Sequence, residues 1–278
     1  MNSKDKIFEG ILLVTDMDGT LLNTSKQVSP ENLAALKGFV DRGGLFTIAT
    51  GRINASVEPY LSCLPVNAPA ILYNGGLIYD FDKHHVLWAK TLPEWIKDTI
   101  PMILEQFHGI GVEVYTEDGD VYVLSENKFT DQHQIHDKLV FHQDSDYRFK
   151  PWRKILCTWE PKKLERLEVW LKKENISLPF VRSEPQFLEI LPEEVNKGTA
   201  LEILIKYLKI SPTNVVAMGD NLNDMEMLQR AEVGIAVANA NDDLKKVALF
   251  NCTHHDNHAV REVIHWITQE WEKVLLSI

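Results

Sequence analysis

Two aspartates stand two positions apart directly after a short apolar run near the beginning of the chain, in the segment Asp16-Met17-Asp18-Gly19-Thr20. The spacing places both carboxylates in the loop that leaves the run, and Gly19 permits a tight turn there. A carboxylate can attack phosphorus and form an aspartyl phosphate. A second one can protonate the leaving oxygen and later activate water. Asp16 can serve as the nucleophile and Asp18 as the acid and base.

Other residues offer what phosphoryl transfer also needs, which is charge neutralisation and positioning. Magnesium prefers oxygen ligands, usually one or two carboxylates together with water and phosphate. Asp16 and Asp220 supply two carboxylates, and a backbone carbonyl near Asp18 supplies a third oxygen. Lys197 opens a predicted helix, where its ammonium and the free N–H groups can hold phosphate. The hydroxyl of Thr50 can donate to another phosphate oxygen.

The candidate residues follow short apolar runs that stop abruptly at polar or glycine residues. Runs without polar alternation are typical of strands buried on both faces, as in a parallel sheet covered by helices. Ligands bind beyond the carboxyl ends of the strands in such a sheet. We therefore expect Asp16, Thr50, Asn74 and Asp220 to meet at one rim. The runs are 11–15, 45–49, 70–73, 215–218 and 233–237.

Helical patterns lie between these runs. Ser29 is a good capping residue and Pro30 suits the first helical position, and Gly43-Gly44 ends the pattern that they begin. Alternation of strands and helices at both ends of the chain predicts an α/β fold, a doubly wound, Rossmann-like parallel-sheet domain that is split in sequence. The other predicted helices are 198–208, 222–230, 241–248 and the tail from 257 onward.

The middle of the chain has a different pattern. Residues 113–116 and 121–124 flank an Asp-Gly turn, which indicates a β-hairpin. The run 155–159 precedes a charged helix at 161–174, and 187–191 reads as a last strand. This antiparallel α+β character predicts an inserted second domain at 85–188, with the core formed by 1–84 together with 189–278.

Composition narrows the classes of function. The chain has 278 residues, which suits two domains, and its formal net charge is −11. That charge argues against a general nucleic-acid surface. It does not argue against a small phosphorylated partner, because one divalent cation and a few aimed donors override the global field inside a pocket. The three cysteines show neither zinc spacing nor a disulfide framework.

The N-terminal stretch from Met1 to Lys6 does not lead into the apolar core of a signal peptide. No run approaches the ~20 apolar residues needed to span a bilayer. We expect a cytoplasmic protein with no membrane partner, and a monomer is a mild preference.

Four segments together resemble the motifs of the haloacid dehalogenase-like (HAD) hydrolase superfamily. They occur in the expected order, and the resemblance covers essentially the whole chain. The insert between the second and third motifs resembles the type IIB cap of the Cof-type subfamily, as do Tyr73–Gly76 and Phe187–Ile190. The four segments are Asp16–Leu22, Thr50-Gly51-Arg52, Lys197 within Val195–Gly198, and Gly219–Met225.

The resemblance implies a magnesium-dependent phosphatase that hydrolyses phosphomonoesters of small metabolites through an aspartyl phosphate at Asp16. It implies Asp18 as acid and base, and Asp224 as a group that orients Lys197 or metal-bound water. The implied metal ligands are Asp16, the backbone of Asp18, Asp220 and Asp224. The candidate substrate-binding residues are Thr50, Gly51, Arg52, Asn74, Lys197 and Asn223.

Some residues allow two interpretations. Arg52 suits either substrate contact or a structural ion pair, and Asn74 either secures its loop or contacts substrate. We expect the histidines of His254-His255-x-x-His258 to be solvated or capping groups rather than metal ligands. Within the insert, the candidates for contact with a leaving group are Arg148, Trp152, Arg153 and Arg182.

Two other functions remain possible on the same residues. A sugar phosphomutase would return the phosphoryl group to substrate, need a bisphosphate activator and release little phosphate. A sugar-phosphate-binding sensor would be expected to have lost Asp16, Asp18 or Lys197, and all three are present.

Overall fold

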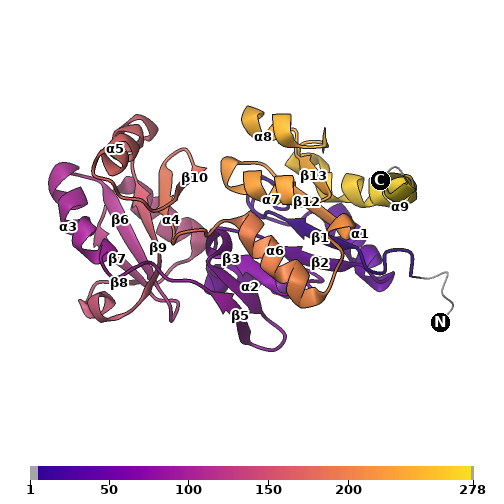
Figure 1. Cartoon of the computed structure of the whole chain (residues 1–278), viewed down its shortest axis with the longest axis horizontal. Coiled ribbons are helices and arrows are strands. Elements are labelled where there is room, and N and C mark those ends of the chain that lie inside the picture. Colours follow the sequence, from indigo (N-terminus) through magenta and orange to yellow (C-terminus); the bar gives the residue numbers. More distant parts are fainter. Residues whose placement is uncertain (1–5, 277–278) are drawn as a thin grey trace. The chain divides into compact units, whose positions relative to one another are not determined.

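The computed structural model describes residues 6–276, with side chains up to Trp271. The N-terminal stretch considered above as a signal sequence lies almost entirely outside these residues. The chain divides into two compact units (Figure 1). The core unit contains the residues up to Thr50, Pro59–Leu87 and the residues from Asn196 onward. The inserted unit contains Gly51–Glu58 and Trp88–Val195.

A five-stranded parallel sheet forms the centre of the core unit, in the order β14-β13-β12-β1-β2. Every residue of β1 is buried, as expected for a central strand covered on both faces. Thr15, the last residue of β1, pairs with both Ile48 and Met218. The strand ends are therefore aligned, and the residues that follow them share one edge. The strands are β1 (Leu12–Thr15), β2 (Leu45–Ile48), β12 (Val215–Gly219), β13 (Val233–Ala236) and β14 (Phe250–Asn251).

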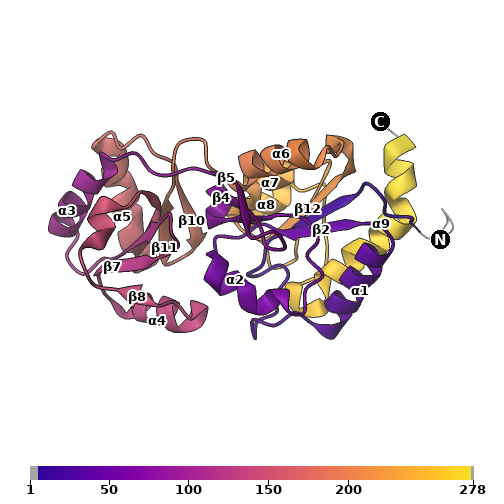
Figure 2. The same ribbon diagram turned by 90° about the horizontal axis from the view of Figure 1, so that it is seen from below.

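Helices cover both faces of this sheet, with α6 and α7 on one face and α1 and α9 on the other (Figures 1 and 2). The predicted start of α1 is confirmed, because Ser29 accepts a hydrogen bond from the Asn32 N–H at 3.2 Å and Pro30 is the first helical residue. The helices are α1 (Pro30–Asp41), α6 (Lys197–Leu208), α7 (Met225–Arg230), α8 (Asp242–Val247) and α9 (Ala259–Leu276), and α2 (Asn54–Leu61) links the two units in sequence.

The predicted strand at 70–73 is shorter than expected and has a different neighbour. Ala70–Leu72 forms β3, which pairs antiparallel with β4 (Leu77–Asp80) in a small sheet completed by β5 (His85–Ala89). A single parallel bridge between Ala49 and Ile71 connects β3 to the end of β2. Tyr73 leaves the strand and begins a short 3₁₀ turn, η2 (Tyr73–Gly75).

The inserted unit is built on a six-stranded sheet in the order β10-β11-β9-β6-β7-β8. The predicted hairpin is confirmed as β6 and β7, which pair antiparallel across Gly119 at φ +94°. Four elements of this unit, α3, α4, β8 and β10, were not predicted from the sequence. The elements are α3 (Ile96–Gln106), β6 (Gly111–Thr116), β7 (Val121–Ser125), α4 (Lys128–Asp137), β8 (Phe141–His142), β9 (Trp152–Thr158), α5 (Pro161–Lys173), β10 (Phe180–Glu184) and β11 (Phe187–Ile190).

The two faces of this sheet differ in chemistry. Val112 and Val114 of β6 belong to an apolar cluster with residues of α3 and α5. Glu113, which lies between them, points to the opposite face, where it contacts His133 of α4. Strand alternation therefore separates a hydrophobic core from a buried polar layer.

Charges in the polar layer are paired. His133 contacts Glu113 at 3.0 Å and Asp137 at 3.6 Å. Burial alone would lower the pKa of His133, but the two carboxylates outweigh it and raise the pKa from 6.5 to about 10. Tyr115 donates its hydroxyl to Glu113 at 2.5 Å. The imidazole is thus a cation at neutral pH.

The same layer binds the short segment Gly51–Glu58 to the inserted unit. Lys154 of β9 donates to the Gly51 carbonyl at 2.9 Å and pairs with Glu189 at 3.0 Å. The hydroxyl of Ser56 donates to the Asp137 carbonyl at 3.1 Å. The sequence did not indicate that these residues group with the insert. The compact units divide at 87/88 and 195/196, a few residues from the predicted boundaries at 84/85 and 188/189.

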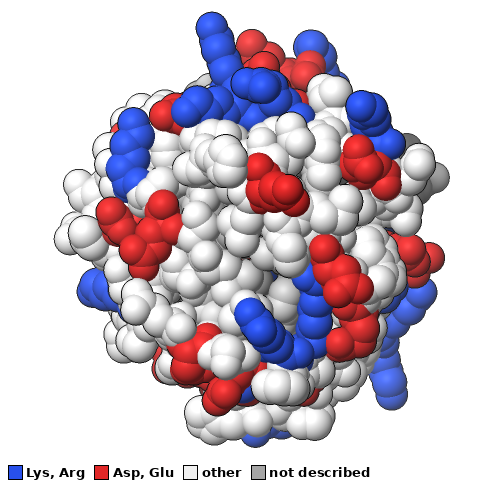
Figure 3. Space-filling view, turned by 90° about the vertical axis from the view of Figure 1, so that its left-hand side faces the viewer, with Lys and Arg blue, Asp and Glu red and all other residues white. Residues whose placement is uncertain are grey.

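The surface shows no extended patch of one charge on the face in Figure 3. Lys and Arg gather at the upper edge beside acidic residues, and both signs are interspersed elsewhere.

Among the residues described, none of the helices combines the length and the apolar composition that a membrane span needs.

We predict that the protein loses stability as the pH rises from about 6.5 toward 10, because native His133 holds a proton that the unfolded chain has released. His133→Gln should cost about 3–5 kcal/mol near pH 6.5, since Glu113 then lacks its buried cationic partner, and less near pH 10. Urea unfolding followed by tryptophan fluorescence at both pH values measures this difference. A cost that does not change with pH would contradict the assignment.

Candidate active site

Asp16 lies directly after β1, where the aligned strand ends meet. Its backbone N–H donates to the Met218 carbonyl of β12 at 2.9 Å, and its side chain is buried. Gly19 has φ +85°, and a Cβ there would lie 2.5 Å from Oδ2 of Asp220. Both facts favour glycine at this position. The turn therefore brings the first carboxylate run against Asp220, from the other end of the chain.

Lys197 is the first residue of α6 and is completely buried. Its Nζ atom lies 2.5 Å from Oδ1 of Asp16 and 2.6 Å from Oδ1 of Asp224. Burial alone would lower the pKa of Lys197, but these two carboxylates raise it above its ordinary value. Asn196 and Thr199 form a reciprocal capping box that fixes the start of the helix.

Asp224 organises the loop after β12 as well as the lysine. Its Oδ2 atom accepts the backbone N–H groups of Asp220 at 2.9 Å and Asn221 at 3.2 Å. Since Oδ1 accepts from Lys197, both oxygens are engaged. The arrangement supports the interpretation that Asp224 orients Lys197.

Three carboxylates face one ammonium group in this cluster. Burial raises the pKa of Asp16 to about 7 despite Lys197, and Asp224 and Asp18 add to the rise. Burial, Asp16 and Asp224 likewise raise the pKa of Asp220 well above its ordinary value. The protein's own residues thus leave negative charge in excess at this point.

The donor set fits a hard divalent cation. Asp16, Asp220 and Asp224 each offer a carboxylate oxygen, and these atoms lie within 4.8 Å of one another. Magnesium takes oxygen ligands of this kind, and a cation would relieve the charge excess. Thr20 orients one of the carboxylates by donating to Oδ1 of Asp220 at 2.9 Å.

Asp18 is more accessible than Asp16, with 27% of its side chain exposed. Lys26 contacts it at 2.7 Å, from a loop closed by a hydrogen bond between the Asn23 N–H and the Gln27 carbonyl. Sequence reasoning missed Lys26, since nothing in the pattern shows that this loop folds back. A partly exposed carboxylate beside a buried one suits proton exchange with a leaving group and water.

Thr50, Asn74 and Asn223 come together within the core unit. The Asn74 N–H donates to the Thr50 carbonyl at 3.0 Å. Nδ2 of Asn223 donates to Oδ1 of Asn74 at 3.0 Å. The structure thus unites three of the predicted substrate-binding residues.

Arg52 and Gly51 belong to the inserted unit. The Arg52 guanidinium pairs with Asp137 at 3.3 Å, with only 6% of its side chain exposed. The sequence allowed either a structural ion pair or substrate contact for Arg52, and this contact is an ion pair within the inserted unit. The Gly51 carbonyl accepts from Lys154.

The other candidates in the insert already have protein partners. Trp152 is buried and donates to the Tyr147 carbonyl at 2.8 Å, and Arg182 pairs with Glu168. The Arg148 guanidinium lies over the Tyr147 ring. Arg153 donates to the Glu117 carbonyl at 3.0 Å.

The histidine-rich segment holds a loop in place. Nδ1 of His255 lies 2.7 Å from the Leu22 carbonyl, and Nδ1 of His258 lies 2.9 Å from the Ser29 hydroxyl. Asp256 accepts from the backbone and hydroxyl of Thr24, each at 2.7 Å. His254, His255 and Asp256 have ligand-type atoms close together, but two of the three are used to anchor 22–24.

The sequence pattern of the haloacid dehalogenase-like hydrolases matches residues 13–264. The chain belongs to this family. The match spans both passages through the core unit and the insert between them, and it includes every residue of the carboxylate and lysine cluster. The chain is therefore an enzyme of the hydrolase class.

Several named relatives of the enzyme are phosphatases. The HMP-PP phosphatase of Serratia proteamaculans is 31% identical over 269 residues, covering 92% of this chain and 95% of that protein. A 5-amino-6-(5-phospho-D-ribitylamino)uracil phosphatase of Bacillus subtilis is 31% identical, covering 89% and 94%. A haloacid dehalogenase-like hydrolase from Bacteroides thetaiotaomicron superposes with a TM-score of 0.81 at 26% identity, covering 92% and 99%.

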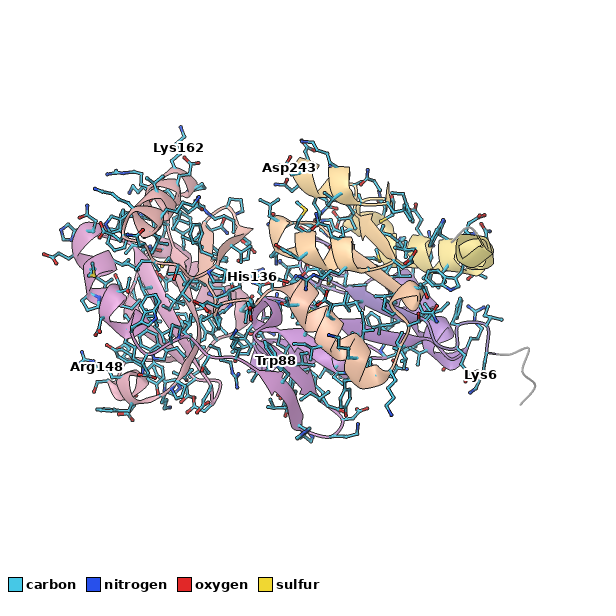
Figure 4. The ribbon with its side chains drawn as sticks, in the orientation of Figure 1. Lys6, Trp88, His136, Arg148, Lys162 and Asp243 are labelled. Carbon is cyan, nitrogen blue, oxygen red and sulfur yellow. The ribbon has the colours of Figure 1, made fainter. Side chains whose placement is uncertain are left out.

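Asp224→Asn tests whether this carboxylate organises the lysine or only binds metal. We predict a loss of about 3–5 kcal/mol in the free energy of unfolding in EDTA, because a buried ammonium loses one charged partner. Urea unfolding with EDTA and with excess magnesium measures it. Asp243→Asn on α8 (Figure 4), an exposed acidic residue, is the matched control and should have little effect. A variant that matches wild type in EDTA would instead indicate a metal ligand alone.

Proposed function

We propose that the enzyme is a magnesium-dependent phosphatase that hydrolyses phosphomonoesters of small metabolites through an aspartyl phosphate at Asp16. The observation that carries the proposal is the buried cluster in which Lys197 pairs with Asp16 and Asp224 beside Asp220. This arrangement combines a carboxylate nucleophile, a fixed cation and an oxygen donor set for a metal at the end of one sheet.

In the first step, a carboxylate oxygen of Asp16 attacks phosphorus, and the bond from phosphorus to the leaving oxygen breaks. Protonated Asp18 gives its proton to that leaving oxygen, so the product departs as a neutral alcohol. The ammonium of Lys197, held against Asp16, lies where negative charge is transferred during the attack.

In the second step, water attacks the phosphorus of the aspartyl phosphate. Asp18, now a carboxylate, takes a proton from the water, and the bond from phosphorus to Asp16 breaks. Inorganic phosphate leaves, and both aspartates return to their initial states.

We propose magnesium as the cofactor, held by Asp16, the backbone of Asp18 and Asp220, with Asp224 nearby. When bound, it supplies neutralisation of phosphoryl charge and of the crowded carboxylates. The raised pKa values of Asp16 and Asp220 support a site that is completed by a cation. Thr50, Gly51, Lys197 and Asn223 are the proposed phosphate contacts. Asn74 is proposed to secure the loop between them, and Arg52 stays a candidate substrate-binding residue.

The proposed substrates are small phosphorylated metabolites, and the proposed role of the inserted unit is to select among them. The name of the Bacillus subtilis relative points to phosphate esters of ribitylaminouracil compounds. A phosphate-release panel should therefore contain such compounds together with sugar phosphates, nucleotides, pyridoxal phosphate and flavin mononucleotide, ranked by kcat/KM. Phosphate release without a bisphosphate activator separates this function from a phosphomutase.

Asp16→Asn should abolish magnesium-dependent phosphate release from p-nitrophenyl phosphate, because an amide cannot form the acyl phosphate. Circular dichroism should show an intact fold. Normal turnover by this variant would refute the nucleophile. Separately, full activity of the wild-type enzyme in EDTA would refute the metal requirement.

Asp18→Asn should lower steady-state kcat by about 10²–10⁴-fold, since the variant lacks the base for the second step. Nitrophenolate is a good leaving group that needs little protonation, so the first step should persist. Rapid mixing should then show a burst of about one nitrophenolate per enzyme molecule. A uniformly slow reaction without a burst would argue against a covalent phosphoenzyme.

A further inference from the structure

The turn Tyr73–Gly75 after β3 has an unusual backbone. Tyr73 and Asn74 both have φ +52°, and Gly75 follows at φ +102°. The left-handed region is unfavourable for residues with a Cβ atom, and two such residues in succession are rarer still. Strain of this kind persists where the surrounding structure imposes it and is concentrated at functional sites.

This turn touches three segments that carry proposed phosphate contacts. Its backbone binds the Thr50 carbonyl through Asn74, and the Asn74 side chain accepts from Asn223. A Cβ on Gly75 would lie 2.3 Å from the Asn196 carbonyl oxygen and 3.1 Å from the Lys197 nitrogen. The turn therefore packs against the start of α6 as well.

Asn74 is buried and Asn223 is half-buried, and the hydrogen bonding of both amides is incomplete. Asn74 is 1% exposed. Within the described part of the chain, Nδ2 of Asn74 and Oδ1 of Asn223 are buried without a hydrogen-bond partner. A buried polar atom without a partner destabilises a fold, so neither the strain nor the amide pair is explained by local stability.

We propose that the Tyr73–Gly75 turn is a positioning element for phosphate binding, in which Asn74 orients the Asn223 amide and the Thr50 loop. This inference rests on the proposed phosphatase function. The left-handed backbone is what allows one residue to bind Thr50 through its N–H and Asn223 through its side chain. Asn74 thus acts through its neighbours and is a positioning residue.

Asn74→Gly removes the amide but retains access to the left-handed backbone. In assays with p-nitrophenyl phosphate and magnesium, we expect the inhibition constant of inorganic phosphate and KM to rise about 10-fold, as for loss of one positioned hydrogen bond to a charged ligand. The melting temperature should change little. Asn74→Ala should show the same kinetic change together with a lower melting temperature.

The double variant Asn74→Gly/Asn223→Ala tests whether Asn74 acts through Asn223 or independently of it. If Asn74 positions Asn223, the KM and phosphate inhibition constant of the double variant should be no higher than those of Asn223→Ala, whereas multiplied effects would overturn the proposal.

Lys209→Ala is the matched control for Asn74→Ala, because Lys209 has φ +56° at the other end of α6. It should lower the melting temperature without changing phosphate inhibition.

Two further outcomes distinguish the inference from the function on which it rests. An active wild-type enzyme whose Asn74→Gly variant keeps wild-type KM and phosphate inhibition would overturn the positioning role alone. A wild-type protein without magnesium-dependent turnover of any phosphomonoester in the panel would overturn the proposed function, and the positioning role with it.

Discussion

The rest of the core unit depends on one interaction, the pairing of the fully buried Lys197 ammonium with two carboxylates. Removing a cation from water is costly unless carboxylates replace the water. Lys197 finds two, and they come from opposite ends of the chain. The register that aligns the ends of β1 and β12, and the capping box that starts α6, both serve to place these three groups within contact.

The same cluster contains three carboxylates and one ammonium, so its net charge is negative. Burial, together with the neighbouring carboxylates, raises the pKa values of Asp16 and Asp220, and a divalent cation would relieve the excess negative charge. Asp224, with both oxygens engaged by Lys197 and the loop backbone, contributes order more than free ligand capacity. Asp18 stands apart and is partly exposed, as suits a group that must exchange protons, and Lys26 contacts it.

The inserted unit also contains buried charged side chains that are paired with one another. His133 lies between Glu113 and Asp137, and Lys154 lies between Glu189 and the Gly51 carbonyl. Removal of one partner from such a pair is costly, because the other charge is then left buried alone. Because Gly51 and Arg52 are held by this layer, the segment after Thr50 is coupled to the inserted unit. A change in these residues of the inserted unit is therefore expected to affect the segment that follows Thr50, a proposed phosphate contact.

The sequence by itself determined the family, the fold class and the short-range chemistry. The buried strands are apolar runs in the sequence, and Ser29-Pro30 marks a helix start. Asp16-x-Asp18-Gly19 places two carboxylates in one turn, and the three later motifs together with it indicate the family. These features are local, so periodicity and capping express them directly. The hairpin around Gly119 was readable for the same reason.

Only the tertiary structure decided which partners the polar residues take. Nothing near Arg52 in sequence indicates Asp137, and nothing near Asp18 indicates that Lys26 folds back upon it. The left-handed turn at Tyr73–Gly75 was mistaken in part for strand, because contacts with Thr50, Asn223 and α6 override its local preference. Such pairings join residues far apart in the chain, and their energy comes from burial and charge, which no local pattern encodes.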